Sequence, residues 1–243
     1  MDFGNLLSIL KTSSRRIVAG SIAVLGLLGY LSGVQAASQS EDAGPYVVLL
    51  GAPGSGKTTH GDALGEKYDV PVLHAAELLE KEIRRALNYS GSPARKGAAT
   101  RRAQRAQRTL DQLEDGELVD DETLNAFIAS RISQPDCQNG FVIDGYPNSV
   151  AQADFLDLYL QDRGIDSLAV VYLDISDEVA RARMQQRART DDRQGFGEER
   201  LQQFRSNIEP ILEFYDGEQL LRVDTTKEIS AVDSEIVDFL GTP

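Results

Sequence analysis

Eight residues near the start of the chain have the types and the spacing of a loop that cradles phosphate groups. The run GAPGSGKT, residues 51–58, fits the pattern G-x-x-x-x-G-K-[ST] at every position. Glycines let the backbone turn tightly and aim successive N–H groups into one concavity. The lysine adds a full positive charge, and the threonine hydroxyl is a ligand for Mg²⁺. The run therefore predicts ATP binding by Gly51, Gly54, Ser55, Gly56, Lys57, Thr58 and Thr59.

A second run, GFVIDGYPNSVAQ at residues 140–152, places a carboxylate directly after apolar residues that are typical of a buried strand. Ligands of open α/β sheets bind outside the carboxyl ends of the strands, so we expect Asp144 beside the phosphate loop. We predict that Thr58 and Asp144 hold Mg²⁺, acting through water. The alternative is that Asp144 only begins a turn before Gly145.

Together the two motifs resemble those of the adenylate kinase family of nucleoside monophosphate kinases, over about residues 45–240. The resemblance implies a P-loop NTPase-type parallel sheet flanked by helices, a helical monophosphate-binding insert at 74–120 and a short lid at 187–200. It implies that Arg183 contacts the ATP adenine and Arg187 the phosphates. Arginine supplies planar, permanent donors for the spread negative charge of phosphoryl transfer. The catalytic residues implied in this way are Lys57, Arg187, Arg189 and Arg200.

The resemblance also implies an acceptor site, but two of its arginines are missing. Asn148 stands where the family usually has an arginine, and Glu80 replaces an arginine that would grip the acceptor phosphate. Each lost charge-assisted contact is worth about 1.5–3 kcal/mol. Other features survive, because Gln152 occupies the position of a base-reading glutamine and the backbone near Val119 would meet the base. The implied acceptor-binding residues are Val119, Gly145, Asn148, Gln152, Arg189 and Arg200.

A basic segment lies within the implied insert. Nine basic residues fall between Lys81 and Arg108, where the only acidic residue is Glu82. One hypothesis is that an arginine of this segment replaces the lost acceptor contacts, and the alternative is a solvated helix or loop. The candidates are Arg84, Arg85, Arg95, Arg101, Arg102, Arg105 and Arg108.

The resemblance, together with these residues, predicts Mg²⁺-dependent transfer of the γ-phosphoryl group of ATP to a nucleoside monophosphate. AMP is the expected acceptor, which gives the reaction ATP + AMP = 2 ADP. Two alternatives stay open. Glu80 and Asn148 favour a nucleotide-binding protein whose kinase activity is lost or weak. A small-molecule kinase with a non-nucleotide acceptor would use the same phosphate loop.

The elements that position these residues alternate between strands and helices, which indicates an α/β fold around a parallel sheet. Continuous apolar runs such as YVVLL predict strands that are buried on both faces. Ser176 is the expected N-cap of one helix, and Pro210 is expected to bend another. Strands are predicted at 46–50, 70–73, 140–144, 168–175 and 220–224, and helices at 57–68, 77–87, 100–114, 121–133, 152–161, after Ser176, at 200–215 and at the end of the chain up to Leu240.

The composition fits an acidic globular protein without a nucleic-acid partner. Of the 243 residues 41% are hydrophobic, and the formal net charge is −13, whereas nucleic-acid binding needs a basic footprint. The single Cys137 excludes an internal disulfide framework, and with only His60 and His74 besides, no Cys- or His-based metal site is expected. We expect a monomer.

The first 37 residues differ from the rest of the chain. Lys11, Arg15 and Arg16 precede an apolar run at 17–31, and the small residues of VQAA follow. This order predicts a signal peptide or membrane anchor at 1–37, a linker at 38–44 and the kinase-like domain at 45–243. We expect export to a periplasm-like compartment, with membrane contact only through 17–31 if this run is uncleaved. The alternative is a cytoplasmic protein in which the run forms a buried or interfacial helix.

Overall fold

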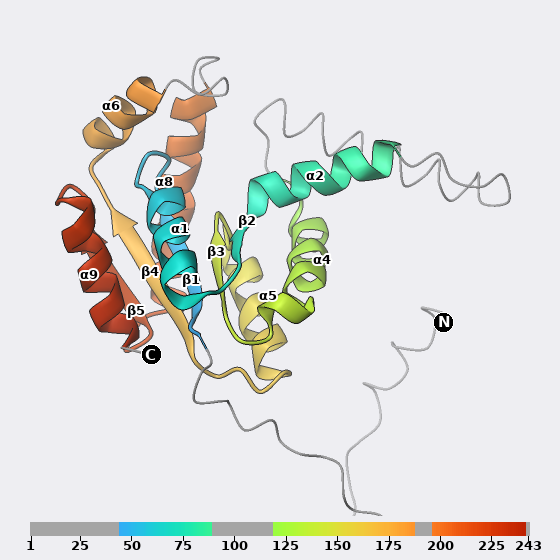
Figure 1. The fold of residues 1–243 in the computed structure, drawn as a ribbon. Helices are drawn as coiled ribbons and strands as arrows, with labels where there is room; N and C mark the ends of the chain where they lie inside the picture. The colour runs from blue at the N-terminus through green and yellow to red at the C-terminus, as the bar shows by residue number, and fades with distance from the viewer. Residues whose placement is uncertain (1–43, 89–118, 188–195, 242–243) are drawn as a thin grey trace, which may run out of the picture. The chain divides into compact units, whose positions relative to one another are not determined.

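The computed structural model describes residues 44–88, 119–187 and 196–241, all within one compact unit, Gln39–Pro243 (Figure 1). Two regions predicted from the sequence fall outside these ranges, namely the N-terminal signal or anchor segment and the helix at 100–114. Most of the predicted insert and most of the predicted lid are also outside them, so their boundaries stay predictions. No helix in the described ranges is both long enough and apolar enough to cross a membrane.

A five-stranded sheet forms the centre of the described unit, and every pair of neighbouring strands is parallel. The order across the sheet is β2-β3-β1-β4-β5, so the strand that leads into the phosphate loop lies in the middle. The predicted α/β fold with a parallel sheet is therefore confirmed. The strands are β1 (Tyr46–Gly51), β2 (Val72–His74), β3 (Phe141–Asp144), β4 (Leu168–Asp174) and β5 (Leu220–Asp224).

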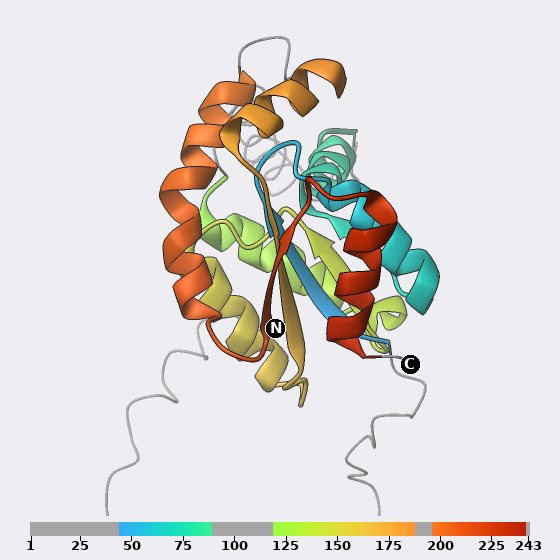
Figure 2. The same ribbon diagram turned by 90° about the vertical axis from the view of Figure 1, so that its left-hand side faces the viewer.

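Helices cover both faces of the sheet (Figure 2), which explains why every residue of β1 is buried. Each predicted helix in the described ranges is present, and a short 3₁₀ turn, η3 (Pro135–Cys137), was not predicted. The helices are α1 (Lys57–Tyr68), α2 (Ala75–Asn88), α4 (Asp121–Ile132), α5 (Val150–Gln161), α6 (Asp177–Arg187), α8 (Phe196–Phe214) and α9 (Ile229–Leu240).

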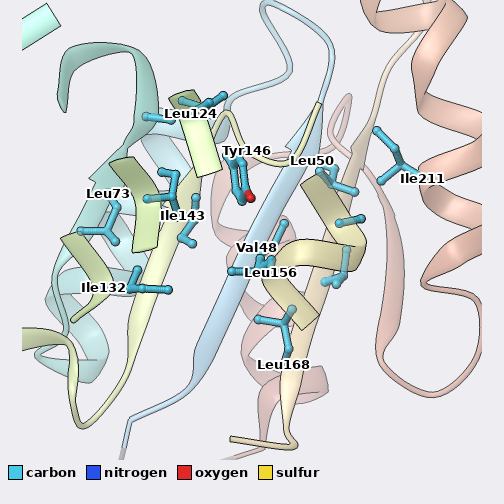
Figure 3. Close-up of a cluster of buried hydrophobic side chains, with 14 of the residues drawn as sticks. Val48, Leu50, Leu73, Leu124, Ile132, Ile143, Tyr146, Leu156, Leu168 and Ile211 are labelled. Carbon is cyan, nitrogen blue, oxygen red and sulfur yellow. The ribbon is translucent and has the colours of Figure 1, made fainter. Parts of the chain in front are cut away.

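The two faces of β1 pack into two separate hydrophobic cores. Val48 and Leu50 point into the larger core, together with side chains of α4, α5 and α8 (Figure 3). Val47 and Leu49 point into the second core, together with side chains of α1 and α9. This alternation is what a strand of period two produces when both of its faces are covered. Both faces of the sheet are therefore packed against helices.

Candidate functional site

The predicted phosphate loop connects β1 to α1 at the carboxyl edge of the sheet. Gly54 and Gly56 have φ angles of 85° and 99°, in the left-handed region that favours glycine. A methyl group at Gly54 would also lie 2.9 Å from the backbone oxygen of Ala180 in α6. Gly56 is the N-cap of α1, so the amino end of that helix faces the loop. The glycines thus serve both the turn and the close approach of α6.

The polar side chains of the loop differ in their surroundings. Lys57 Nζ donates to the backbone oxygens of Gly51 and Ala52 over 2.7 and 3.2 Å, which places its ammonium group along the loop. Ser55 is fully buried, and within the described residues its hydroxyl makes no hydrogen bond. Thr59 is exposed at the first turn of α1. The structure therefore places all seven predicted ATP-loop residues between the last residue of β1 and the first turn of α1.

Asp144 accepts hydrogen bonds at one oxygen from two different elements. Thr58 Oγ1 donates to Asp144 Oδ2 over 3.1 Å, and His74 Nδ1 lies 3.1 Å from the same oxygen. His74 Nε2 in turn lies 3.2 Å from Asp62 Oδ1. His74 and Asp62 were given no role from the sequence alone. The available signals were weak: His74 follows a short predicted strand, and Asp62 lies one helical turn after Thr58.

The surroundings of Asp144 keep its carboxyl group ionised. Burial alone would raise the pKa of Asp144, but the hydrogen bond from His74, the charge of Lys57 and the hydrogen bond from Thr58 together hold it below its ordinary value. The hydrogen bond to Asp144 raises the pKa of His74 against the opposing effect of burial, and nearby carboxylates, including Asp62, raise it further. The site therefore presents a carboxylate and a hydroxyl, both hard oxygen donors, 3.1 Å apart.

The predicted acceptor residues Asn148 and Gln152 are joined by a hydrogen bond. Asn148 N–H donates to Gln152 Oε1 over 2.7 Å, and Gln152 Nε2 donates to Asp121 Oδ1 over 2.6 Å. The side-chain amide of Asn148 donates to the backbone oxygen of Gly145 over 2.9 Å. Gln152 is almost completely buried, at 3% exposure, and the Val119 side chain lies in the larger core. Asp121, which our sequence analysis did not single out, therefore fixes the orientation of the Gln152 amide.

Glu80, the acidic residue in place of an expected arginine, is paired within its own helix. Arg84 lies one turn later in α2, and its Nε and Nη2 donate to Glu80 Oε1 over 2.8 and 2.6 Å. Both side chains are largely exposed, so the pair adds little to stability, but it offsets the negative charge of Glu80. The other candidate arginines of the basic segment either fall outside the described residues or have side chains that are not described.

The predicted lid arginines begin on α6. Arg183 donates to the backbone oxygens of Thr225 and Gly54 over 2.6 and 3.4 Å, so it joins the phosphate loop to the end of β5. Arg187 is exposed at the last position of α6, and Arg200 is partly exposed in α8. Arg189 lies outside the described residues. The structure therefore ties Arg183 directly to the phosphate loop.

An open pocket of about 340 Å³ adjoins this arrangement, at the carboxyl ends of β4 and β5. It lies next to the contact that Arg183 makes, because Thr225 falls between two residues of its lining. Of the lining residues, only Ser176 was given a role from the sequence, as a helix N-cap, although two of the others are acidic residues at the ends of predicted strands. The lining consists of Asp174, Ile175, Ser176, Asp224 and Thr226.

Comparisons with known proteins agree with this geometry. The family model described as adenylate kinase matches residues 49–220. The chain is 34% identical over 206 residues to an adenylate kinase of Chelativorans sp. (strain BNC1), covering 80% of this chain and 98% of that protein. It is 35% identical over 201 residues to an adenylate kinase of Mesorhizobium japonicum, covering 78% and 93%. An adenylate kinase of Mycobacterium tuberculosis (strain H37Rv) is 34% identical over 195 residues, covering 80% and 98%.

Proposed function

The chain belongs to the adenylate kinase family and is a nucleoside monophosphate kinase, and on this premise we propose that its acceptor is AMP. The reaction is then ATP + AMP = 2 ADP. The observation that carries this proposal is the fixed amide of Gln152. A primary amide has two N–H donors and two carbonyl lone pairs, and the contacts with Asn148 and Asp121 use one of each. The remaining donor and acceptor match the donor–acceptor edge of adenine.

The residues at the carboxyl edge fit a bound magnesium ion. Mg²⁺ takes one or two carboxylates together with substrate phosphates and water, and an ionised Asp144 beside the Thr58 hydroxyl is a donor set of this kind. We propose that these two residues hold Mg²⁺ through water. When bound, Mg²⁺ neutralises charge on the phosphate oxygens of ATP. No group of three or more His, Cys, Asp or Glu side chains in the described ranges has the arrangement of a metal site.

The cationic side chains supply the rest of the proposed catalysis. Phosphoryl transfer is mainly positioning and neutralisation of negative charge, so no covalent intermediate on the protein is required. Lys57 lies along the phosphate loop, where its ammonium group can contact the outer phosphates of ATP. We propose that Arg187, Arg189 and Arg200 contact the transferring group and both nucleotides. Arg183 is proposed to face the ATP base from its anchored position next to Thr225.

One observation favours a second candidate function, nucleotide binding with weak or lost transfer. The Asn148 amide is neutral, so it lacks the charge that an arginine would bring to the acceptor phosphate, and it donates to its own turn at Gly145. Glu80 and Arg84 neutralise each other only in part, because both are exposed. In this case the protein would bind ATP with little turnover of any acceptor.

A coupled assay separates the two candidates. Purified protein with Mg·ATP is given AMP, CMP, GMP, UMP or no acceptor, and ADP formation is followed. We expect AMP to support the fastest turnover, and we expect Lys57→Met to lower that turnover by at least 100-fold. Faster turnover with another monophosphate would contradict AMP as the acceptor. ATP binding in a calorimeter without turnover of any acceptor would select the nucleotide-binding function.

A further inference from the structure

Four side chains close a ring of contacts beneath the phosphate loop. Two of them, Thr58 and Asp62, lie one turn apart on a single face of α1, and the other two, His74 and Asp144, end neighbouring strands. The contacts run from Thr58 to Asp144 (3.1 Å), from Asp144 to His74 (3.1 Å) and from His74 to Asp62 (3.2 Å). The backbone of α1 completes the ring.

Strand register is the reason that His74 reaches Asp144. In the pairing of β2 with β3, His74 stands directly opposite Asp144, and neighbours in register on parallel strands point to the same face of the sheet. Both side chains are poorly exposed, at 20% for His74 and 11% for Asp144. The imidazole can therefore occupy few positions, and the contact with the Asp62 carboxylate on its far side restricts the ring further.

The two hydrogen bonds to Asp144 end on the same atom, Oδ2, so neither of them occupies Oδ1. A carboxylate fixed by one oxygen presents its other oxygen in a defined direction. Side chains that orient a metal-binding carboxylate or histidine in this way change metal affinity or activity by roughly 10- to 100-fold when they are removed.

We propose that His74 is a positioning residue. It fixes the Asp144 carboxylate through Oδ2 and so leaves Oδ1 directed towards the Mg²⁺ of the bound nucleotide. Asp62 holds the His74 imidazole in place. This inference rests on the proposed function in one respect, the assignment of Asp144 to Mg²⁺. A merely structural histidine would stabilise the fold without changing how tightly the protein–ATP complex holds a divalent ion.

The test compares variants of the full chain by their metal affinity. Mn²⁺ is titrated into protein saturated with ATP, and free Mn²⁺ is followed by electron paramagnetic resonance. We expect His74→Ala to weaken Mn²⁺ binding to the protein–ATP complex by about 10-fold or more, and Asp62→Asn to weaken it by less. His74→Asn keeps a donor near the position of Nδ1, so it should restore most of the affinity. The affinity for metal-free ATP should change by less than about 2-fold in every variant.

Asp233→Asn is the matched control. It removes the carboxylate from the other histidine–aspartate pair of the described residues, in which His60 Nδ1 lies 2.6 Å from Asp233 Oδ1 and neither side chain contacts Asp144. We expect this variant to leave the Mn²⁺ affinity unchanged, and circular dichroism melting shows which variants remain folded. Turnover gives a second readout, because loss of His74 should raise the Mg²⁺ concentration for half-maximal kcat and leave the KM for ATP nearly constant.

The inference would be overturned if His74→Ala held Mn²⁺ as tightly as the parent protein, or if it lost metal-free ATP binding to the same degree. It would also be overturned if His74→Asn were as defective as His74→Ala while melting like the parent. Failure of the proposed function has a different signature, since a parent protein that does not phosphorylate AMP would still give a Mn²⁺ titration that decides the role of His74.

Discussion

Gln152 is a buried side chain, and the residues around it require an amide at this position. Its Nε2 lies 2.6 Å from Asp121 Oδ1, so replacing this donor with an oxygen would bring two carboxyl groups into contact. We expect Gln152→Glu to lower the free energy of unfolding by about 2–4 kcal/mol, because one carboxyl must either protonate or face the other. Urea denaturation at neutral pH measures this change.

The double variant is the control for that prediction. Asp121→Asn combined with Gln152→Glu restores a donor opposite an acceptor, so most of the lost stability should return, whereas Asp121→Asn alone should be mildly destabilising. AMP selectivity can be measured on the same proteins. If the single Gln152→Glu variant and the double variant lost equal amounts of unfolding free energy, the Asp121 contact would not be what fixes the amide.

Cys137 gives a prediction about alkaline pH. Burial raises the pKa of the Cys137 thiol to about 11, above the ordinary value near 9, although the neighbouring Arg131 opposes this effect. The folded state therefore favours the neutral thiol, and the resulting stability is complete below pH 9 and is lost as the pH rises towards 11. Between pH 8 and 10.5, the parent should lose about 1–2 kcal/mol more unfolding free energy than Cys137→Ala. Parallel pH profiles of the two proteins would contradict this prediction.

Local sequence was enough to predict some site residues and could not predict others. The glycines, Lys57 and Thr58 were found because the phosphate loop is a contiguous motif, and Asp144 because it ends a strand. His74 and Asp62 were missed because their meeting depends on the register of two strands and on the face of α1. No local pattern carries that information. Asp121 was missed for the same reason, since it lies far from Gln152 in the sequence.

At the scale of elements, α1 packs against the sheet through two glycines with different neighbours. A methyl group at Gly65 would overlap Val72 Cγ2 and lie 3.1 Å from the backbone oxygen of Val70. A methyl group at Gly61 would lie 3.2 Å from Leu49 Cδ1, the end of a flexible side chain. Of these two glycines, Gly65 therefore lies closer to the sheet and has less room for a methyl group.

The two glycines should respond differently to the same change. Replacing a helical glycine with alanine gains about 1 kcal/mol of helix propensity, whereas overpacking costs about 1–3 kcal/mol. We expect Gly65→Ala to be less stable than the parent, and Gly61→Ala to lie within about 1 kcal/mol of it. Thermal and urea unfolding of both variants test the difference. A Gly65→Ala protein as stable as Gly61→Ala would mean that the close approach of α1 to the sheet does not exclude a methyl group at residue 65.

Most elements could be predicted, because apolar runs and caps are local signals. The Ser176 hydroxyl accepts from the backbone N–H of Val179 over 3.4 Å, as expected for an N-cap. The predicted strand at 70–73 is shifted, since Pro71 has no N–H for the ladder and pairing with β3 continues to His74. The helix predicted from Arg200 begins four residues earlier, at Phe196, and continues through Pro210 to Phe214.

At the scale of the whole molecule, the N-terminal segment bears on where the protein is located. We propose that the chain is exported and that residues near 1–36 are removed. Loss of three basic residues and one acidic residue would change the net charge from −13 to −15. We expect N-terminal sequencing of the natural protein to begin near Ala37, and fractionation to recover it outside the cytoplasm. A natural protein that begins at Met1 in the soluble cytoplasmic fraction would contradict export.

The ring beneath the phosphate loop has a practical consequence for refolding. Its members come from three separated stretches of chain, so an unfolded or half-assembled molecule cannot present it, and magnesium-bound nucleotide should favour only the finished form. A resin carrying immobilised Mg·ATP would then sort a refolding mixture, retaining chains in which α1, β2 and β3 have docked and passing the others. The retained fraction would report folding yield directly.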